Sequence, residues 1–320
     1  MKLADMTRRD FIQSLGAGTG GLLATSALPV FSADRPELFP HRGRWERLSI
    51  VSQHIDAGAT KPFSVLHISD THFTSAYPDE SEWVRKMAAR RVRTFGGRQE
   101  EALRDSLSWA KAHVDYVIHT GDMIDFQSRA NFDLVRKHCG PAAYMFTGSL
   151  GNHELYTGQP KRKERDAFKS ETIGSAQEAF PFDVSLQSTV VNGVNIVTID
   201  NSYGTFTERQ VTRFKAEVAK GLPIVMCMHC PILTPRIRRA FLRFWAHENL
   251  KAIPDVSAWK WSSAHAVTQG FVDYLRSLPL LKGILAGHLH ISVADRFSPT
   301  AMQYVVGGNF LFHGQEITIS

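Results

Sequence analysis

The feature that most constrains this chain is a series of metal-ligating residue types, each of which closely follows a short apolar run. In chain order they are Asp70 and His72, Asp122, Asn152, His229, and His288 with His290. Carboxylate, amide and imidazole groups are common oxygen and nitrogen ligands of divalent ions. Five such segments in this order are hard to obtain by chance, and they predict a fold that gathers all seven side chains around two metal ions. His153, beside Asn152, is expected not to be a ligand.

Short runs rich in branched and aromatic residues predict strands just before these motifs. The runs cover residues 63–69, 116–120, 142–147, 194–199, 223–228 and 283–286. Between them, apolar residues recur at helical spacing over 103–114, and Thr207 and Gln210 form a capping-box sequence that opens a helix ending near Gly221. Alternating strands and helices predict an α/β fold, in which ligands gather beyond the carboxyl ends of the strands.

These ligand types suit the hydrolysis of a phosphoester. Negative charge gathers on the oxygens of a phosphoester under attack, and two divalent ions ~3.5–4 Å apart neutralise it and lower the pKa of a bridging water. Such a centre needs a carboxylate that touches both ions. Asp122 is the expected bridge, because the Gly121-Asp122 turn lets its carboxylate project from a strand end. The mixed donor set favours Mn, Fe, Zn or Ni over calcium, which prefers cages made of oxygen alone.

Together the five motifs resemble those of the calcineurin-like metallophosphoesterases. They read Asp70-Thr71-His72, Gly121-Asp122, Gly151-Asn152-His153-Glu154, His229 and Gly287-His288-Leu289-His290. The resemblance runs from about Val65 to His290 and implies two packed mixed β-sheets flanked by helices, a four-layer α/β sandwich. It also implies two sets of ligands. Asp70, His72, Asp122 and His290 would hold one metal, and Asp122, Asn152, His229 and His288 would hold the other.

The same resemblance implies catalytic roles for two residues that are not ligands. His153 is the expected general acid for the leaving group, and Asp125 matches the carboxylate that orients this histidine in the phosphoprotein phosphatases. The chain does not fully match the motifs of either of two branches of this family. Purple acid phosphatases carry a tyrosine ligand where Asp125 stands, and phosphoprotein phosphatases continue with Arg-Gly where this chain has Phe126-Gln127. Residues 200–202 resemble a segment of a bacterial branch that includes phosphodiesterases.

The first 33 residues differ in character from the rest of the chain. Arg8 and Arg9 precede a mildly apolar stretch over residues 12–31 that is diluted by glycines, and a charged stretch begins at Asp34. The pattern predicts a twin-arginine signal peptide over residues 1–33 and a phosphoesterase domain over 34–320. A membrane anchor needs ~20 strongly apolar residues, so none is expected in the mature chain. The twin-arginine translocation machinery is the expected partner, and the periplasm or extracellular space the expected location.

Two stretches are longer than strand–helix–strand spacing requires. They lie at residues 77–98 and after Pro231, contain many arginines and some tryptophans, and are expected to form loops around the metal site. A basic, aromatic rim suits an anionic phosphoester substrate, although any single arginine more often lies on a solvated face. Three cysteines are too few for a disulfide scaffold. Cys227 and Cys230 are expected to be small apolar residues of one strand, too far apart to pair.

These observations predict an exported, metal-dependent phosphoesterase with a dinuclear centre and a metal-bridging hydroxide, acting on a phosphodiester or a lipid-linked phosphate. A broad phosphomonoesterase or a nuclease is the alternative. Nucleic-acid binding usually shows denser positive charge than the +6 of this chain, together with a recognisable binding module. A non-catalytic metal-binding scaffold is a remote alternative, because such a protein should have lost ligands, whereas this chain keeps all seven together with His153 and Asp125.

Overall fold

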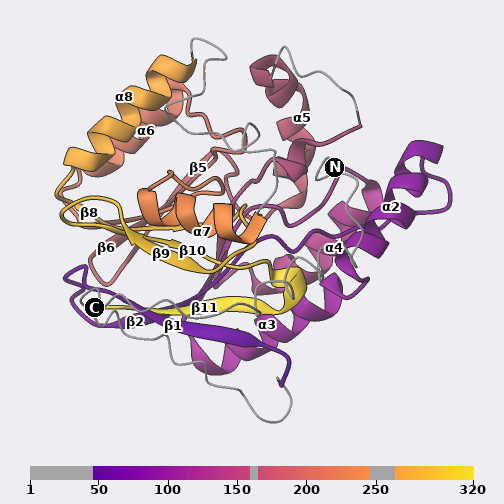
Figure 1. The fold of residues 1–320 in the computed structure, drawn as a ribbon, viewed down its shortest axis with the longest axis horizontal. Coiled ribbons are helices and arrows are strands. Elements are labelled where there is room, and N and C mark those ends of the chain that lie inside the picture. The colour runs from indigo at the N-terminus through magenta and orange to yellow at the C-terminus, as the bar shows by residue number, and fades with distance from the viewer. Residues whose placement is uncertain (1–45, 159–164, 246–263) are drawn as a thin grey trace, which may run out of the picture.

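Two mixed β-sheets packed face to face form the centre of the structure (Figure 1). The computed structural model describes residues 46–158, 165–245 and 264–320, so the predicted signal peptide lies outside the described residues. The first sheet has the order β1 (Ser49–Ile55), β11 (His313–Ile319), β2 (Phe63–Ile68), β3 (Tyr116–Thr120) and β4 (Phe146–Ser149). The second has the order β5 (Leu186–Val191), β6 (Val194–Ile199), β7 (Ile224–Cys227), β8 (Leu281–Ala286), β10 (Met302–Val305) and β9 (Val293–Arg296).

Helices cover the outer faces of both sheets, which gives the fold four layers (Figure 1). The helices α3 (Gln99–His113), α4 (Arg129–Cys139) and α5 (Arg165–Ala179) pack on the first sheet, and α6 (Glu208–Val218) and α8 (Ala264–Ser277) pack on the second. Between the sheets, Val65, Ile118 and Ile317 belong to the same buried cluster as Ile196 and Val225. The predicted sandwich of two helix-flanked mixed sheets is therefore confirmed.

Strand direction brings the predicted motifs to one edge of the sandwich. In the first sheet β2, β3 and β4 are parallel, and in the second β6, β7, β8 and β10 are parallel. The C-terminal strand β11 runs parallel to β1 and antiparallel to β2, which makes the first sheet mixed. Loops that leave the carboxyl ends of parallel strands share one edge of a sheet, and this is where open α/β sheets bind ligands.

Local sequence signals account for several element boundaries. The predicted strands at 116–120 and 194–199 are β3 and β6, and Thr207 and Gln210 form the expected capping box at the start of α6. The strand expected at 142–147 is displaced along the chain. Residues Gly140–Ala142 form a short 3₁₀ helix instead, because Pro141 at its start favours a helical turn, and β4 begins only at Phe146.

The two stretches expected as loops around the site contain helices. Residues 77–98 include α2 (Glu82–Phe95), which Ser81 caps at its first turn and which Gly96 ends in the left-handed conformation. The stretch after Pro231 begins with α7 (Pro235–Trp245), and residues 246–263 lie outside the described residues. Both sequences are rich in strong helix formers with apolar residues at helical spacing, which favours a helix over a loop. None of the helices within the described ranges is both long and apolar enough to cross a membrane.

Candidate metal centre

The residues predicted as metal ligands follow strands whose carboxyl ends share one edge of the sandwich. Asp70 and His72 follow β2, Asp122 follows β3, Asn152 follows β4, His229 follows β7, and His288 and His290 follow β8. Six of the seven approach one another as two groups of side chains that meet at Asp122. Asn152 stands between Gly151 and His153, and the His153 N–H donates to Oδ1 of Asp122 over 2.9 Å.

The first group consists of Asp70, His72 and His290. Nε2 of His72 lies 3.1 Å from Nε2 of His290 and 3.8 Å from Oδ1 of Asp70. Nε2 of His290 lies 3.3 Å from the same Asp70 oxygen. Nε2 of His72 is also 3.7 Å from Oδ2 of Asp122. Four ligand-type atoms from four residues therefore converge on a single small volume.

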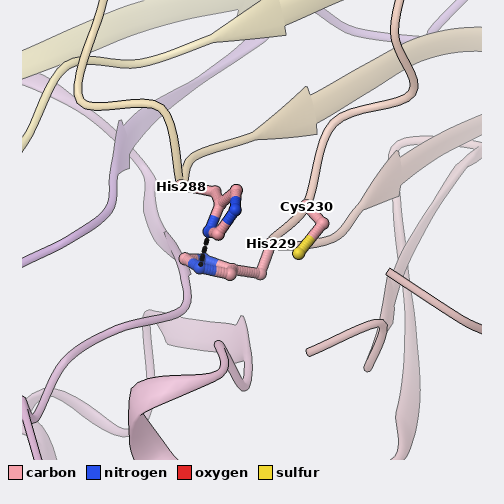
Figure 2. Close-up of side chains that lie close together, drawn as sticks. All are labelled: His229, Cys230 and His288. Carbon is pink, nitrogen blue, oxygen red and sulfur yellow. Dashed lines mark hydrogen bonds between the residues drawn. The ribbon is translucent and has the colours of Figure 1, made fainter. Parts of the chain in front are cut away.

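The second group consists of His229 and His288, again with Asp122. Nε2 of His229 lies 3.2 Å from Oδ2 of Asp122 and 3.1 Å from Nδ1 of His288. Figure 2 shows the two imidazoles approaching each other from different segments of the chain. Nδ1 of His229 donates to the backbone carbonyl of Thr120 over 2.7 Å. This contact fixes the ring so that Nε2 faces the other donors.

Some acceptor atoms at this place lack hydrogen-bond partners within the described part of the protein, so the arrangement fits a bound cation. Oδ1 of Asp70 and Oδ1 of Asn152 are buried and accept no hydrogen bond from any described residue. Nδ1 of His72 donates to Asp125 over 3.1 Å, so the neutral ring turns the lone pair of Nε2 toward the carboxylates. Lone pairs and anionic oxygens this close repel one another unless positive charge lies among them. These donors match those of divalent transition-metal sites.

The protonation states of most of these groups also suit metal binding. Burial lowers the pKa of His72 to about 4 and that of His288 to about 3, so both rings are neutral. Burial alone would raise the pKa of Asp122, but the neighbouring histidines, His229 foremost, hold it well below its usual value. Burial would likewise lower the pKa of His229, yet the Asp122 carboxylate outweighs it and raises that pKa to about 10. The buried Asp122 carboxylate and the His229 ring therefore stabilise each other's charged form.

Five of the predicted ligands adopt backbone conformations that side chains rarely take. The φ angles are 57° at Asp70, 55° at His72, 55° at Asp122, 70° at His288 and 56° at His290. Each left-handed residue of this kind costs ~1–3 kcal/mol, and such strain collects at functional sites. Five of the six side chains that approach one another therefore stand on strained backbone.

Buried hydrogen bonds hold the strained turns of the first sheet in place. The Glu154 carboxylate accepts the backbone N–H groups of Asp122, Met123, Ile124 and Gly151 over 2.5–3.1 Å. It therefore joins the turn after β3 to the turn after β4. Burial raises the pKa of Glu154 to about 7, and the nearby Asp122 carboxylate adds to that effect. Sequence reasoning gave Glu154 no role, although it is the last residue of the Gly-Asn-His-Glu motif.

The segment at 200–202 supports the second group. Oδ1 of Asn201 accepts the backbone N–H groups of His229 and Cys230 over 3.0 and 2.9 Å, and its Nδ2 donates to the Cys230 carbonyl. Asp200 forms an ion pair with Lys169 at 2.5 Å. Asp200 and Asn201 are both buried. The contacts of Asn201 therefore hold the turn that carries His229.

Cys230 departs from its predicted place. Cys227 lies on β7 in the core between the sheets, as expected, and the three cysteines of the described residues are free. Cys230 lies beyond the strand, and its Sγ is within 4.8 Å of ligand atoms of His229 and His288 (Figure 2). Its thiol donates to the Ser202 carbonyl over 3.8 Å, and burial raises its pKa well above the usual value. It is a buried thiol at the border of the candidate centre.

His153 and Asp125, the predicted acid and its orienting partner, are in direct contact. Nδ1 of His153 lies 3.0 Å from Oδ1 of Asp125 and 2.8 Å from the Asp125 backbone carbonyl. Burial would lower the pKa of His153, but the carboxylates of Asp122 and Asp125 together raise it to about 9. The same Oδ1 of Asp125 also accepts the contact from His72. One carboxylate oxygen thus serves a predicted ligand and the predicted acid.

Sequence reasoning missed two residues of α2 that reach this place. The Arg91 guanidinium donates two hydrogen bonds to Asp125, of 2.6 and 2.7 Å. The Phe95 ring stacks on the ring of His72, with centroids 4.4 Å apart and planes inclined by 12°. In the sequence Arg91 is one of several arginines in a basic stretch. Its position on the apolar face of the helix, between Met87 and Phe95, is the signal that could have found it.

A model of the calcineurin-like phosphoesterase family matches residues 63–292, a range that contains all seven predicted ligands, His153 and Asp125. A search of curated proteins finds no match. A dimetal phosphatase from Danio rerio is similar among solved structures, with 16% identity and a TM-score of 0.49 over 79% of this chain and 91% of that one. The purple acid phosphatase PPD1 of yellow lupin has 14% identity and a TM-score of 0.49 over 79% and 45%. Haemophilus influenzae NAD nucleotidase has 13% identity and a TM-score of 0.40 over 81% and 48%.

Replacing Gly151 tests whether the tight turn keeps Asp122 in place. A Cβ at Gly151 would lie 2.2 Å from Oδ1 and 2.5 Å from the backbone N of Asp122, so Gly151→Ala must displace that carboxylate. We expect metal affinity to fall by at least the ~10–100-fold typical of lost support around a metal ligand. The matched control is Gly174→Ala on α5, where a Cβ meets nothing within 4 Å. Calorimetric titration with Mn²⁺ measures both, and equal affinities in the two variants would contradict the expectation.

Proposed function

Because the chain belongs to the calcineurin-like phosphoesterase family, and is therefore a metal-dependent phosphoester hydrolase, we propose that it holds two divalent ions that share the carboxylate of Asp122. The position of that carboxylate supports the proposal. Its Oδ2 lies 3.7 Å from Nε2 of His72 in one donor group and 3.2 Å from Nε2 of His229 in the other. Asp70, His72, Asp122 and His290 would hold one ion, and Asp122, Asn152, His229 and His288 the other. The mixed nitrogen and oxygen donors suit Mn, Fe, Zn or Ni.

When bound, such ions neutralise charge on the phosphoester oxygens and lower the pKa of a water. The protein's own residues would place and protonate the leaving group. During hydrolysis a water oxygen bonds to phosphorus, the ester P–O bond breaks, and the departing oxygen needs a proton. His153 would donate it from Nε2, since its Nδ1 is held by Asp125 and no described residue hydrogen-bonds Nε2. The attacking water loses a proton, which restores the balance.

The surroundings of His153 favour a phosphodiester or a lipid-linked phosphate with an apolar or ring-bearing alcohol. The Tyr156 ring lies 6.4 Å from the His153 ring, and the Trp83 ring lies 5.7 Å from Tyr156. Tyr156 is 39% exposed, so this aromatic surface is open to a ligand. Aromatic faces of this kind contact apolar and ring-bearing groups. Next to the centre, α7 packs on Leu289 and Ile291 while its four arginines are exposed, which favours an anionic substrate.

Removing the shared carboxylate should abolish both metal binding and turnover. We expect Asp122→Ala to lose most bound metal and more activity than the ~10–100-fold that loss of a supporting residue costs. Asp133→Ala on the exposed side of α4 is the matched control and should keep both properties. Elemental analysis and nitrophenyl phosphate turnover measure the two effects. Two metals per chain with normal turnover in Asp122→Ala would falsify the shared-carboxylate proposal.

The substrate class can be tested directly on the metal-loaded protein. We expect kcat/KM for a bis-aryl phosphate to equal or exceed that for the mono-aryl phosphate, because the aromatic surface beside His153 would contact the second ester group. Cyclic diesters, lipid-derived phosphates and single-stranded DNA complete the panel. A clear preference for monoesters across several alcohols would instead assign a broad phosphomonoesterase, and cleavage of DNA above all other substrates would assign a nuclease.

Export by the twin-arginine route rests on residues 1–33, which lie outside the described residues. Arg8 and Arg9 before a glycine-diluted apolar stretch support it. We expect the double variant Arg8→Lys with Arg9→Lys to accumulate in the cytoplasm, while the unaltered chain reaches the periplasm or the medium. Cell fractionation with an antibody to the folded domain measures this. A normal exported amount of the double variant would overturn the assignment.

A further inference from the structure

Asp125 is the meeting point of three side chains from different parts of the chain. It is 1% exposed. Its Oδ1 contacts Nδ1 of His72 at 3.1 Å, Nδ1 of His153 at 3.0 Å and the Arg91 guanidinium at 2.7 Å. Its Oδ2 is bonded by Arg91 at 2.6 Å, and no other described residue donates to that atom. Arg91 is thus the partner that both oxygens share.

We propose that Arg91 is a positioning residue of this enzyme, which acts by fixing the orientation of the Asp125 carboxylate. With Oδ2 held by the guanidinium, the carboxylate cannot rotate to give each imidazole its own oxygen. His72 and His153 therefore stay directed at the single atom Oδ1. The proposal rests on the proposed function in one respect, because it takes His153 as the acid and His72 as a ligand.

The chemistry of the contact favours an arginine over any other residue. A guanidinium presents parallel N–H groups that match the two oxygens of a carboxylate, so one side chain fixes both the distance and the plane of the other. A lysine would place its charge near Asp125 without fixing that plane. Such a paired contact between buried charges restricts geometry more than it adds stability.

The helix that carries Arg91 is anchored on both sides of the contact. Met87 and Ala88, one turn before Arg91, pack with Phe126, the residue after Asp125. Phe95, one turn after Arg91, stacks on His72, and the guanidinium lies 4.8 Å from the Phe95 ring centroid. The helix α2 therefore touches Asp125, its chain neighbour and one of its imidazole partners. This repeated contact distinguishes Arg91 from the exposed basic residues of the same helix.

As a consequence, Asp125 connects the orientation of His72, a predicted metal ligand, with that of His153, the predicted acid. His72 orients Nε2 toward Asp70, Asp122 and His290, and this orientation depends on the bond from its Nδ1 to Asp125. His153 depends on the same oxygen. Freeing the carboxylate should therefore misplace the acid and loosen a ligand, although Arg91 touches neither ring through a hydrogen bond.

Steady-state kinetics of Arg91→Gln at saturating Mn²⁺ is the first test. We expect kcat to fall by ~10–100-fold, the usual cost of losing a residue that orients a ligand, with KM nearly unchanged. The loss should be larger for an alkyl phosphate than for a nitrophenyl phosphate, whose leaving group departs without a proton. The matched control is Arg104→Gln, an exposed arginine of α3, which should leave both constants unaltered. A raised KM with an unchanged kcat would overturn the proposal, because it would make Arg91 a substrate ligand.

A double-mutant cycle then asks whether Arg91 acts through Asp125. In the Asp125→Asn background, Arg91→Gln should add little further loss. If the two residues act independently, the losses of kcat in the two single variants should multiply in the double variant to within about twofold. That result would overturn the proposal.

The conservative variant Arg91→Lys should recover less than half of the kcat lost in Arg91→Gln, since it keeps the charge but not the paired geometry. Recovery to the unaltered rate would show that charge alone suffices. Circular dichroism checks each variant, and Arg91→Lys serves in place of Arg91→Gln if the latter does not fold.

Nuclear magnetic resonance of the ¹⁵N-labelled full chain gives a readout that does not depend on turnover. The Nδ1–H signals of His72 and His153, assigned with His72→Gln and His153→Gln, should be protected in the unaltered chain and shifted or lost in Arg91→Gln, but unchanged in Arg104→Gln. Unchanged signals in Arg91→Gln would overturn the positioning role. If the unaltered chain hydrolyses no phosphoester, the proposed function fails, and these signals still decide whether Arg91 fixes the two rings.

Discussion

The hydrogen bonds accepted by the buried carboxylate of Glu154 hold together the two turns on which the candidate centre depends. It accepts four backbone N–H groups from the turns after β3 and β4, and so holds the strained conformation at Asp122 against the start of the Gly-Asn-His-Glu segment. A buried donor left without a partner costs ~1–3 kcal/mol, so the Glu154 side chain stabilises this turn. Gly151 makes the approach possible, because any Cβ there would overlap Asp122.

Asp122 and Asp70 use their two carboxylate oxygens in the same way. Asp122 uses Oδ1 to hold the His153 backbone and turns Oδ2 toward His72 and His229. Asp70 likewise uses Oδ2 to hold the His288 backbone over 2.9 Å, and its Oδ1 faces His290. In each case one oxygen fixes the loops and the other stays available at the centre. These hydrogen bonds hold both carboxylates in place, and such preorganisation lowers the cost of forming a binding site.

Much of this arrangement could be predicted from the sequence, because the predicted metal ligands stand in short motifs directly after strand-like runs. Asp122 and His229 follow β3 and β7 as expected, and those boundaries come from local apolar runs. Arg91 and Asn201 could not be predicted in the same way. Their partners, Asp125 and the His229 turn, are distant in sequence, and no local pattern records a contact made only when α2 or the second sheet packs. The predicted position of Cys230 on a strand was wrong, because β7 ends at Cys227, three residues before it.

If two metal ions share the Asp122 carboxylate, as proposed, the unaltered protein must bind two ions per chain, and the stoichiometry of metal binding can be measured. Purified protein, stripped with a chelator and titrated with Mn²⁺, should be examined by native mass spectrometry alongside phosphoester turnover at each step. We expect turnover to appear only as the second ion binds, with saturation at two ions per chain. Saturation at one ion with full turnover, or full turnover in the stripped protein, would contradict it.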